Sequence, residues 1–234
     1  MAPRAAPHPT ARAPLSRQRV LRAAMRLADE DGIAALTMRR LAGTLGVEAM
    51  SLYHHVASKG ALQDAIVDLV IAEISMPDDA DRPWDETVRA FAVSAHAALL
   101  RHPWACALVL APTGRAAGTA HPRLQYMEWL LGRLHDAGFP PTLVYHAYHT
   151  LDGHILGFTL WQLAHSPTAP PPPGGADLTG LATDFLRDLP HEELPHLAAH
   201  VRQHLAGTPG GGEFEFGLDL ILDGLRRARA AGPT

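Results

Sequence analysis

The stretch that most constrains this chain is TMRRLAGTLGVEAMSLYHHVASK, residues 37 to 59, which has the pattern of two short helices joined by a tight turn. Gly46 stands at the turn, where the backbone needs a residue that tolerates positive φ. Apolar residues on both sides of it recur at helical spacing and would share one core, namely Leu41, Leu45, Val47, Leu52 and Val56. This spacing predicts a helix-turn-helix, the arrangement that lays one helix into the major groove of DNA.

The second of these helices leaves short and varied side chains outside the core. They are Glu48, Ala49, Met50, Ser51, Tyr53, His54 and His55. Small and polar side chains of this kind suit the reading of base edges better than they suit packing. The sequence therefore predicts that the second helix reads DNA.

The same stretch resembles the N-terminal domain of the tetracycline-repressor (TetR) family of one-component transcriptional regulators. The family pattern is Thr, Arg-x-Leu-Ala, Leu-Gly-Val, Leu-Tyr-x-His and a following Lys. Its landmarks stand here as Thr37, Arg39, Leu41, Ala42, Leu45, Gly46, Val47, Leu52, Tyr53, His55 and Lys59. The match covers roughly residues 16 to 74. The remainder, with LRHPWACALVL, LHDAGF and GHILGF, looks like the family's all-helical effector-binding and dimerisation domain.

The resemblance implies roles for individual residues. Those implied to read bases are Ala49, Met50, Ser51 and His54, and those implied to hold phosphates are Tyr53, His55 and Lys59. Thr37 and Arg39 would hold phosphates too or reach a base from the preceding helix. Tyr53 has a second interpretation, as a core aromatic with its hydroxyl at the surface. Because His54 replaces the aromatic residue of the tetracycline-repressor branch, that branch's operator sequence does not carry over.

Charge is distributed unevenly along the chain. Residues 1 to 60 hold nine Lys or Arg and four acids, a net charge of +5, whereas the rest carries −9 and the total is −4. A basic N-terminal part on an acidic body is the pattern of a phosphate-contacting domain joined to one that avoids DNA.

Helical periodicity and breaker residues divide the chain into three parts in an all-α fold. We expect a flexible basic arm over residues 1–15, a three-helix DNA-binding domain over 16–60, and a larger helical effector-binding and dimerisation domain over 61–234. Proline-rich SPTAPPPPGG and glycine-rich GTPGGG should interrupt that second domain. Its helices are expected at 59–74, 84–102, 104–110, 121–137, 142–165, 177–189, 192–206 and 213–230.

The helix at 142–165 is rich in polar-tipped aromatic and imidazole groups, which can orient a ligand inside an apolar cavity. The residues predicted to line the effector site are Trp104, Met127, Trp129, Tyr145, His146, His149, Asp152 and Trp161. The competing interpretation assigns many of these side chains to the core or to a dimer interface. The resemblance implies that a small-molecule effector releases a homodimer from a palindromic double-stranded DNA operator.

A dimer interface is expected from helix 142–165 and the last helix, since the family pairs its corresponding helices. The last helix has a broad apolar face, which is too large to leave in water, made of Phe214, Leu218, Ile221, Leu222 and Leu225.

Three rival functions remain open. Fifteen histidines include His196, His200 and His204 on one helical face, which is a spacing that can bind a metal ion. The chain could therefore be a metal-responsive regulator with the same DNA-binding domain, or a metal-dependent helical enzyme. A DNA-binding scaffold without a small ligand is the third. The chain lacks a phosphate loop, a nucleophile elbow and suitably paired carboxylates, so we predict no catalytic residue, no cofactor and no metal site.

No apolar run approaches the roughly 20 residues that span a bilayer, and the N-terminal residues lack an apolar segment of secretory type. Cys106, the single cysteine, cannot form an intramolecular disulfide. We therefore expect a cytoplasmic protein without a membrane partner.

Overall fold

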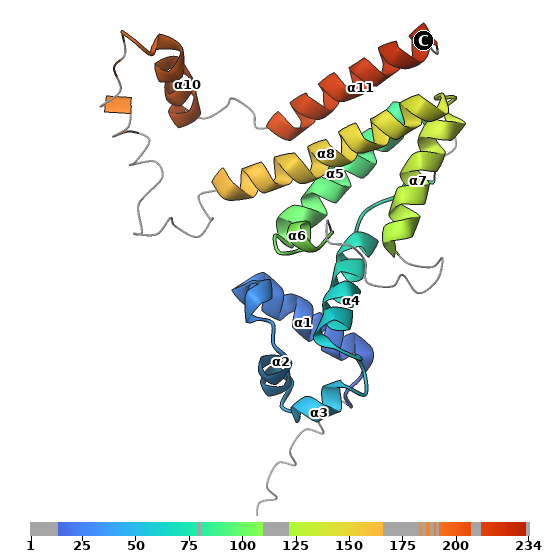
Figure 1. The fold of residues 1–234 in the computed structure, drawn as a ribbon, viewed down its shortest axis with the longest axis vertical. Coiled ribbons are helices and arrows are strands. Elements are labelled where there is room, and N and C mark those ends of the chain that lie inside the picture. Colours follow the sequence, from blue (N-terminus) through green and yellow to red (C-terminus); the bar gives the residue numbers. More distant parts are fainter. Residues whose placement is uncertain are drawn as a thin grey trace, which may run out of the picture.

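The computed structural model describes residues 14–78, 81–109, 122–165, 183, 186–187, 190, 192–206 and 212–232. Within these residues every regular element is a helix and no strand occurs (Figure 1). The predicted all-α fold class is confirmed.

The N-terminal part, which we call the head, contains four short elements at one end of the molecule (Figure 1). They are α1 (Arg17–Asp31), η1 (Ile33–Ala35), α2 (Met38–Leu45) and α3 (Ala49–Leu52). Side-chain oxygens cap the helices: Ser16 Oγ accepts the Arg19 N–H at 3.3 Å, and Thr37 Oγ1 accepts the Arg40 N–H at 3.1 Å. Such caps satisfy backbone donors that a helix start leaves without partners.

Helix α4 (Lys59–Ala72) connects the head to the remaining helices, which we call the body (Figure 1). Ser58 caps its start by accepting the Ala61 N–H at 3.0 Å. Residues on several of its sides are buried, so α4 packs against both the head and the body: Leu62, Ala65, Ile66, Val67, Val70 and Ile71. One hydrophobic core consequently runs from α1 through α4 into the body.

The body is built around the long helix α8. Its helices are α5 (Trp84–Arg101), α6 (Ala105–Val109), α7 (Pro122–Asp136), α8 (Pro141–His165), α10 (Pro195–Ala206) and α11 (Glu213–Ala231). Helix α8 packs against α5, α7 and α11, while α10 stands apart from these helices in this view (Figure 1). Helix α11 runs antiparallel to α8, because its first turn contacts His154 and its last turn reaches Ala137, just before α8 begins.

Most helices begin and end within a few residues of the sequence prediction. Helix α10 begins at Pro195 instead of Glu192, because proline is favoured in the first turn of a helix and disfavoured farther in. The predicted arm, the proline-rich segment and most of the helix expected at 177–189 lie outside the described residues.

The structure corrects the expectation that the apolar face of α11 forms a dimer interface. Phe214, Leu218, Leu222 and Leu225 are buried within this single chain, where α11 packs against α5 and α8. They are therefore core residues and not a dimer interface. The large apolar side chains that α11 leaves exposed are Phe216 at 69% and Leu220 at 58%.

Candidate DNA-binding and effector-binding sites

The turn between α2 and α3 has the geometry that the sequence predicted. Gly46 adopts the left-handed conformation, with φ of 65° and ψ of 41°, and its N–H bonds back to the carbonyls of Ala42 and Gly43. A residue with a Cβ is strained there, whereas glycine is not. The chain can therefore reverse sharply enough to bring α3 across α2.

Helix α3 is only four residues long, and one of its side chains anchors it. Leu52 is fully buried in the core that also holds Leu41 and Leu45 of α2, and Val56 follows it into the same core. Because Leu52 faces this core, Met50 and Tyr53 face solvent and are 71% and 45% exposed. The head thus presents the other side of this short helix to solvent.

All nine predicted DNA-binding residues lie in or beside this α2–α3 unit. Six are exposed, namely Thr37, Arg39, Met50, Tyr53, His54 and Lys59, and Ala49, Ser51 and His55 are half-buried. The hydroxyl oxygen of Thr37 caps α2. Lys59 opens α4, so its charge adds to the positive end of that helix's dipole.

Asp152 and Tyr126 form a hydrogen-bonded pair between α8 and α7. The Tyr126 hydroxyl donates to Asp152 Oδ1 at 3.0 Å. Burial raises the pKa of Asp152, although Tyr126 and His149 oppose that effect. Burial followed by the charge of Asp152 raises the pKa of Tyr148, one turn before it on α8, to about 12. The arrangement is a half-buried carboxylate flanked by two phenols.

Aromatic rings continue from this pair into the core between α5 and α7. Phe91 lies 4.9 Å from Tyr126 and 4.6 Å from Trp129 between ring centroids, and it stacks on the latter. The indole Nε1 of Trp129 is buried and makes no hydrogen bond within the described residues. Proteins rarely bury such a donor without a partner.

The structure brings only some of the predicted effector residues together. Asp152 and Trp129 belong to one cluster with Tyr126 and Phe91. In contrast, Tyr145, His146, His149 and Trp161 are exposed on α8. Met127 is also exposed, and Trp104 lies elsewhere, with its indole nitrogen donating to Asp29 Oδ1 on α1 at 2.6 Å.

Sequence reasoning missed Tyr126 as a member of the cluster. Its hydroxyl meets a carboxylate 26 residues farther along the chain, and no local pattern connects the two.

Two histidines lie in the layer between α5, α8 and α11. The His96 ring stacks on Phe214 at 4.0 Å, and its Nδ1 lies 2.7 Å from the Thr159 hydroxyl. Burial lowers the pKa of His96. His154 Nε2 donates to the Phe214 carbonyl at 2.9 Å, and Gly217 leaves room for that ring. These groups hold α11 against the bundle.

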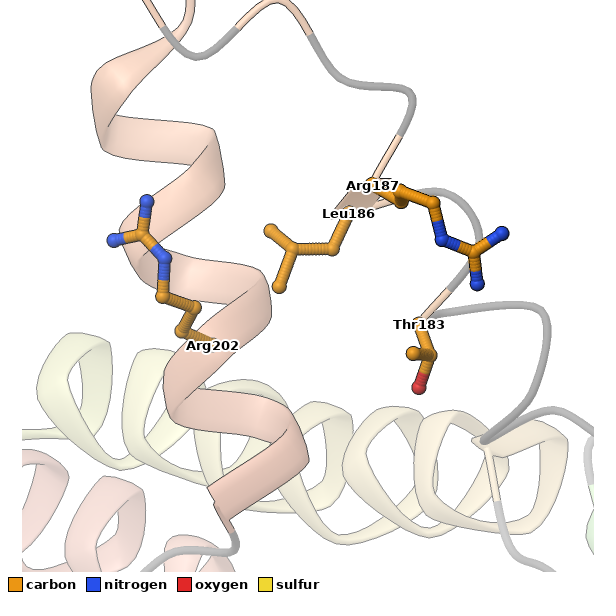
Figure 2. Close-up of a pocket in the computed structure, with 4 residues that line it drawn as sticks. All are labelled: Thr183, Leu186, Arg187 and Arg202. Atoms are coloured by element: carbon orange, nitrogen blue, oxygen red, sulfur yellow. The ribbon is translucent and has the colours of Figure 1, made fainter.

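A pocket of about 430 Å³ lies beside α10 (Figure 2). It is lined by Thr183, Leu186, Arg187 and Arg202, none of which belongs to the predicted effector site.

Among the residues whose positions are described, no three or more His, Cys, Asp or Glu side chains gather to hold a metal ion. His196 and His200 are exposed on α10. Of the helices in the described ranges, none is both long and apolar enough to cross a membrane.

Comparison with known protein families identifies the class. The family described as "Bacterial regulatory proteins, tetR family" matches residues 20–66, and "Tetracyclin repressor-like, C-terminal domain" matches residues 76–229. The chain belongs to the TetR family. The predicted resemblance is confirmed, and it covers the body as well as the head.

Individual TetR-family relatives match over most of their length. The HTH-type transcriptional repressor DrrR1 of Streptomyces coeruleorubidus is 30% identical, over 95% of this chain and 80% of its own. The tetracycline repressor protein class D of Escherichia coli is 30% identical, over 90% and 88%. Among solved structures, Streptomyces coelicolor ActR in complex with actinorhodin superposes with a TM-score of 0.71 at 27% identity, over 93% and 99%. The protein is thus a ligand-responsive transcriptional regulator of the TetR family.

Proposed function

We propose that this protein is a homodimeric repressor that binds a palindromic operator through two copies of the α2–α3 unit and releases it when a small molecule binds the body. The observation that carries the proposal is the exposed surface of α3 and the start of α4 on a basic head. We expect the protein to act on that operator in the cytoplasm.

In this proposal α3 enters the major groove and the flanking residues hold the backbone. Ala49 and Met50 contact apolar features such as a thymine methyl, while Ser51 and His54 hydrogen-bond to base edges. Tyr53, His55 and Lys59 bind phosphates, together with Arg39 and the α4 N-terminus. Thr37 contributes mainly by capping α2, because its side-chain oxygen already accepts the Arg40 N–H.

The dimer is proposed to form through the outer surfaces of α8 and α11. Leu160 and Trp161 on α8 and Phe216 and Leu220 on α11 are large apolar side chains that are exposed in the single chain. Large apolar patches on two adjoining helices usually mark an interface. A two-fold axis there gives two heads for the two half-sites of a palindrome.

The effector is proposed to bind where α5, α7 and α8 meet. The rings of Phe91 and Trp129 offer aromatic surface, the Trp129 N–H lacks an acceptor within the described residues, and Asp152 offers a carboxylate. A flat ring system that carries one hydrogen-bond donor and one acceptor complements these groups. Binding there would move α7 against α4, with which it is in contact, and α4 would carry the change to the head.

The test is a gel shift on DNA that flanks the protein's own gene, with wild type, Arg39→Ala, Tyr53→Ala and the control Arg82→Ala. Arg82 is an exposed arginine of the body. We expect wild type and the control to bind a palindromic fragment. Both head variants should bind it at least about tenfold more weakly, the effect of removing one charged or base-edge interaction.

Circular dichroism must show that the variants are folded. If folded wild type binds no such fragment at low salt, the repressor proposal is wrong. Tetracycline and actinorhodin are the first effector probes, since a relative and a solved neighbour are named with them. Release of the operator by either one should weaken in Asp152→Asn.

A further inference from the structure

The head and the body meet at a buried histidine. His102 caps the C-terminal end of α5, and its side chain is only 8% exposed. It lies between two carboxylates from other helices, Asp29 of α1 in the head and Glu73 at the C-terminal end of α4.

Both ring nitrogens of His102 are engaged. Nδ1 lies 2.7 Å from Asp29 Oδ1, and Nε2 lies 3.3 Å from Glu73 Oε1. Each carboxylate also has a second donor: the Trp104 indole donates to Asp29 Oδ1 at 2.6 Å, and Arg101 donates to Glu73 Oε2 at 2.7 Å.

These contacts determine which form of the imidazole suits the site. A neutral imidazole has one N–H and one lone pair, whereas an imidazolium has two N–H groups. A carboxylate can only accept, so a neutral His102 would turn a lone pair toward one of the two carboxylates. Burial would raise the pKa of Glu73, but the hydrogen bonds and charges of Arg101 and His102 outweigh burial and lower that pKa. The acceptor on this side therefore keeps its charge.

We propose that His102, in its protonated form, is a positioning residue that fixes the orientation of the head on the body for operator binding. The proposal rests on the function proposed above. Two heads must reach two half-sites at a set spacing, and a joint that is already ordered leaves less conformational entropy to lose on binding.

The pH dependence follows from the proton count. With both ring nitrogens protonated, His102 donates one N–H to Asp29 and one to Glu73. Without the second proton, one of the two bonds becomes an approach of a lone pair to a carboxylate, and the joint loosens. Operator affinity therefore falls as the pH rises. The titratable and charged groups that face the ring are Asp29 from α1, Glu73 from α4 and Arg101 from α5.

The experiment measures the operator dissociation constant at pH 6 and pH 8 for wild type, His102→Gln and the control His135→Gln. Glutamine keeps one donor and one acceptor but cannot gain a proton. His135 is an exposed histidine near the end of α7, so the control removes the same residue type elsewhere. His54 and His55 of the head are present in all three proteins, so their contribution cancels in the comparison.

We expect affinity to fall between pH 6 and pH 8 by about tenfold more in wild type and in His135→Gln than in His102→Gln, the size of one charge-assisted hydrogen bond. Equal ratios in wild type and His102→Gln would overturn the proposal. If His102→Gln does not fold, Asp29→Asn and Glu73→Gln take its place, and each should flatten the pH profile.

Nitrogen NMR of the His102 ring gives a readout that needs no DNA. Two protonated ring nitrogens at pH 6 are expected, and a neutral ring at pH 6 would rule out the bridging form. If wild type binds no operator at either pH, the proposed function fails, while the NMR result still decides the state of the joint.

Discussion

The cations of the head and those of the body have different neighbours. In the head, no described acidic side chain pairs with five of the cations, which are Arg17, Arg22, Arg26, Arg39 and Lys59. In the body, Arg89 binds Asp219 at 2.9 Å, Arg133 binds Asp78 at 2.8 Å, and Arg226 binds Asp85. Arginines thus remain available to phosphate in one region, while in the other they join α5 to α11 and α7 to the segment before α5.

Arg40 of the head differs from those five, since it pairs with Asp31 at 2.7 Å and both side chains are well exposed. Exposed pairs of this kind contribute about 0–1 kcal/mol. Arg40 can therefore exchange its partner for a phosphate at little cost.

The largest loss of operator affinity should come from a change in the body that leaves the head unaltered. The double variant Phe216→Asp with Leu220→Asp places two charges on the proposed dimer surface of α11 and should give a monomer. Since one head binds one half-site, operator affinity should fall by about a hundredfold or more, although the head is unchanged. Light scattering and gel shift measure the two effects. The matched control is Leu124→Asp, an exposed leucine on α7. A dimeric double variant would place the interface elsewhere.

Salt dependence separates the two classes of cation. In Lys59→Gln, the slope of log affinity against log salt should decrease by about 0.9 for each phosphate that a head no longer binds. In Arg89→Gln, the slope should stay the same and the free energy of unfolding should fall by about 0.5–1 kcal/mol, because only the pair with Asp219 is removed. A decreased slope in Arg89→Gln would show that the body also binds DNA.

Two glycine substitutions compare packing in the two regions. A Cβ at Gly43 of α2 would have no described neighbour within 4 Å outside its own helix backbone, so Gly43→Ala should stabilise the head by about 0.5–1 kcal/mol through helix propensity. A Cβ at Gly217 would lie 2.6 Å from Cε1 of His154, whose Nε2 bonds to the Phe214 carbonyl. Gly217→Ala should therefore destabilise by about 1 kcal/mol despite the same propensity gain. Thermal unfolding measures both, and a stabilising Gly217→Ala would mean that His154 moves freely.

Local patterns were sufficient where neighbours in sequence are neighbours in space. The caps at Ser16, Thr37 and Ser58 and the turn at Gly46 act within four residues, so the sequence predicted the helix-turn-helix and the surface of α3. The roles of single residues on that surface stay predictions. Periodicity also predicted helix positions, because helical hydrogen bonds are local.

In the body, local sequence patterns were not sufficient to predict which surface is buried. Periodicity placed Phe214 with Leu218 and Leu222 on one apolar face of α11 and left Phe216 off it, but it could not show whether that face packs inside the chain or against a second subunit. Only packing against α5 and α8 decides which side becomes core.

By itself, the sequence determined the family, the all-helical fold and the position of the DNA-reading unit, because each depends on short-range spacing. Tertiary structure alone decided that Tyr126 meets Asp152 and that His102 meets Asp29, 73 residues away. Contacts between distant residues depend on how whole helices pack. The sequence around a polar side chain therefore does not show which distant residue will become its partner.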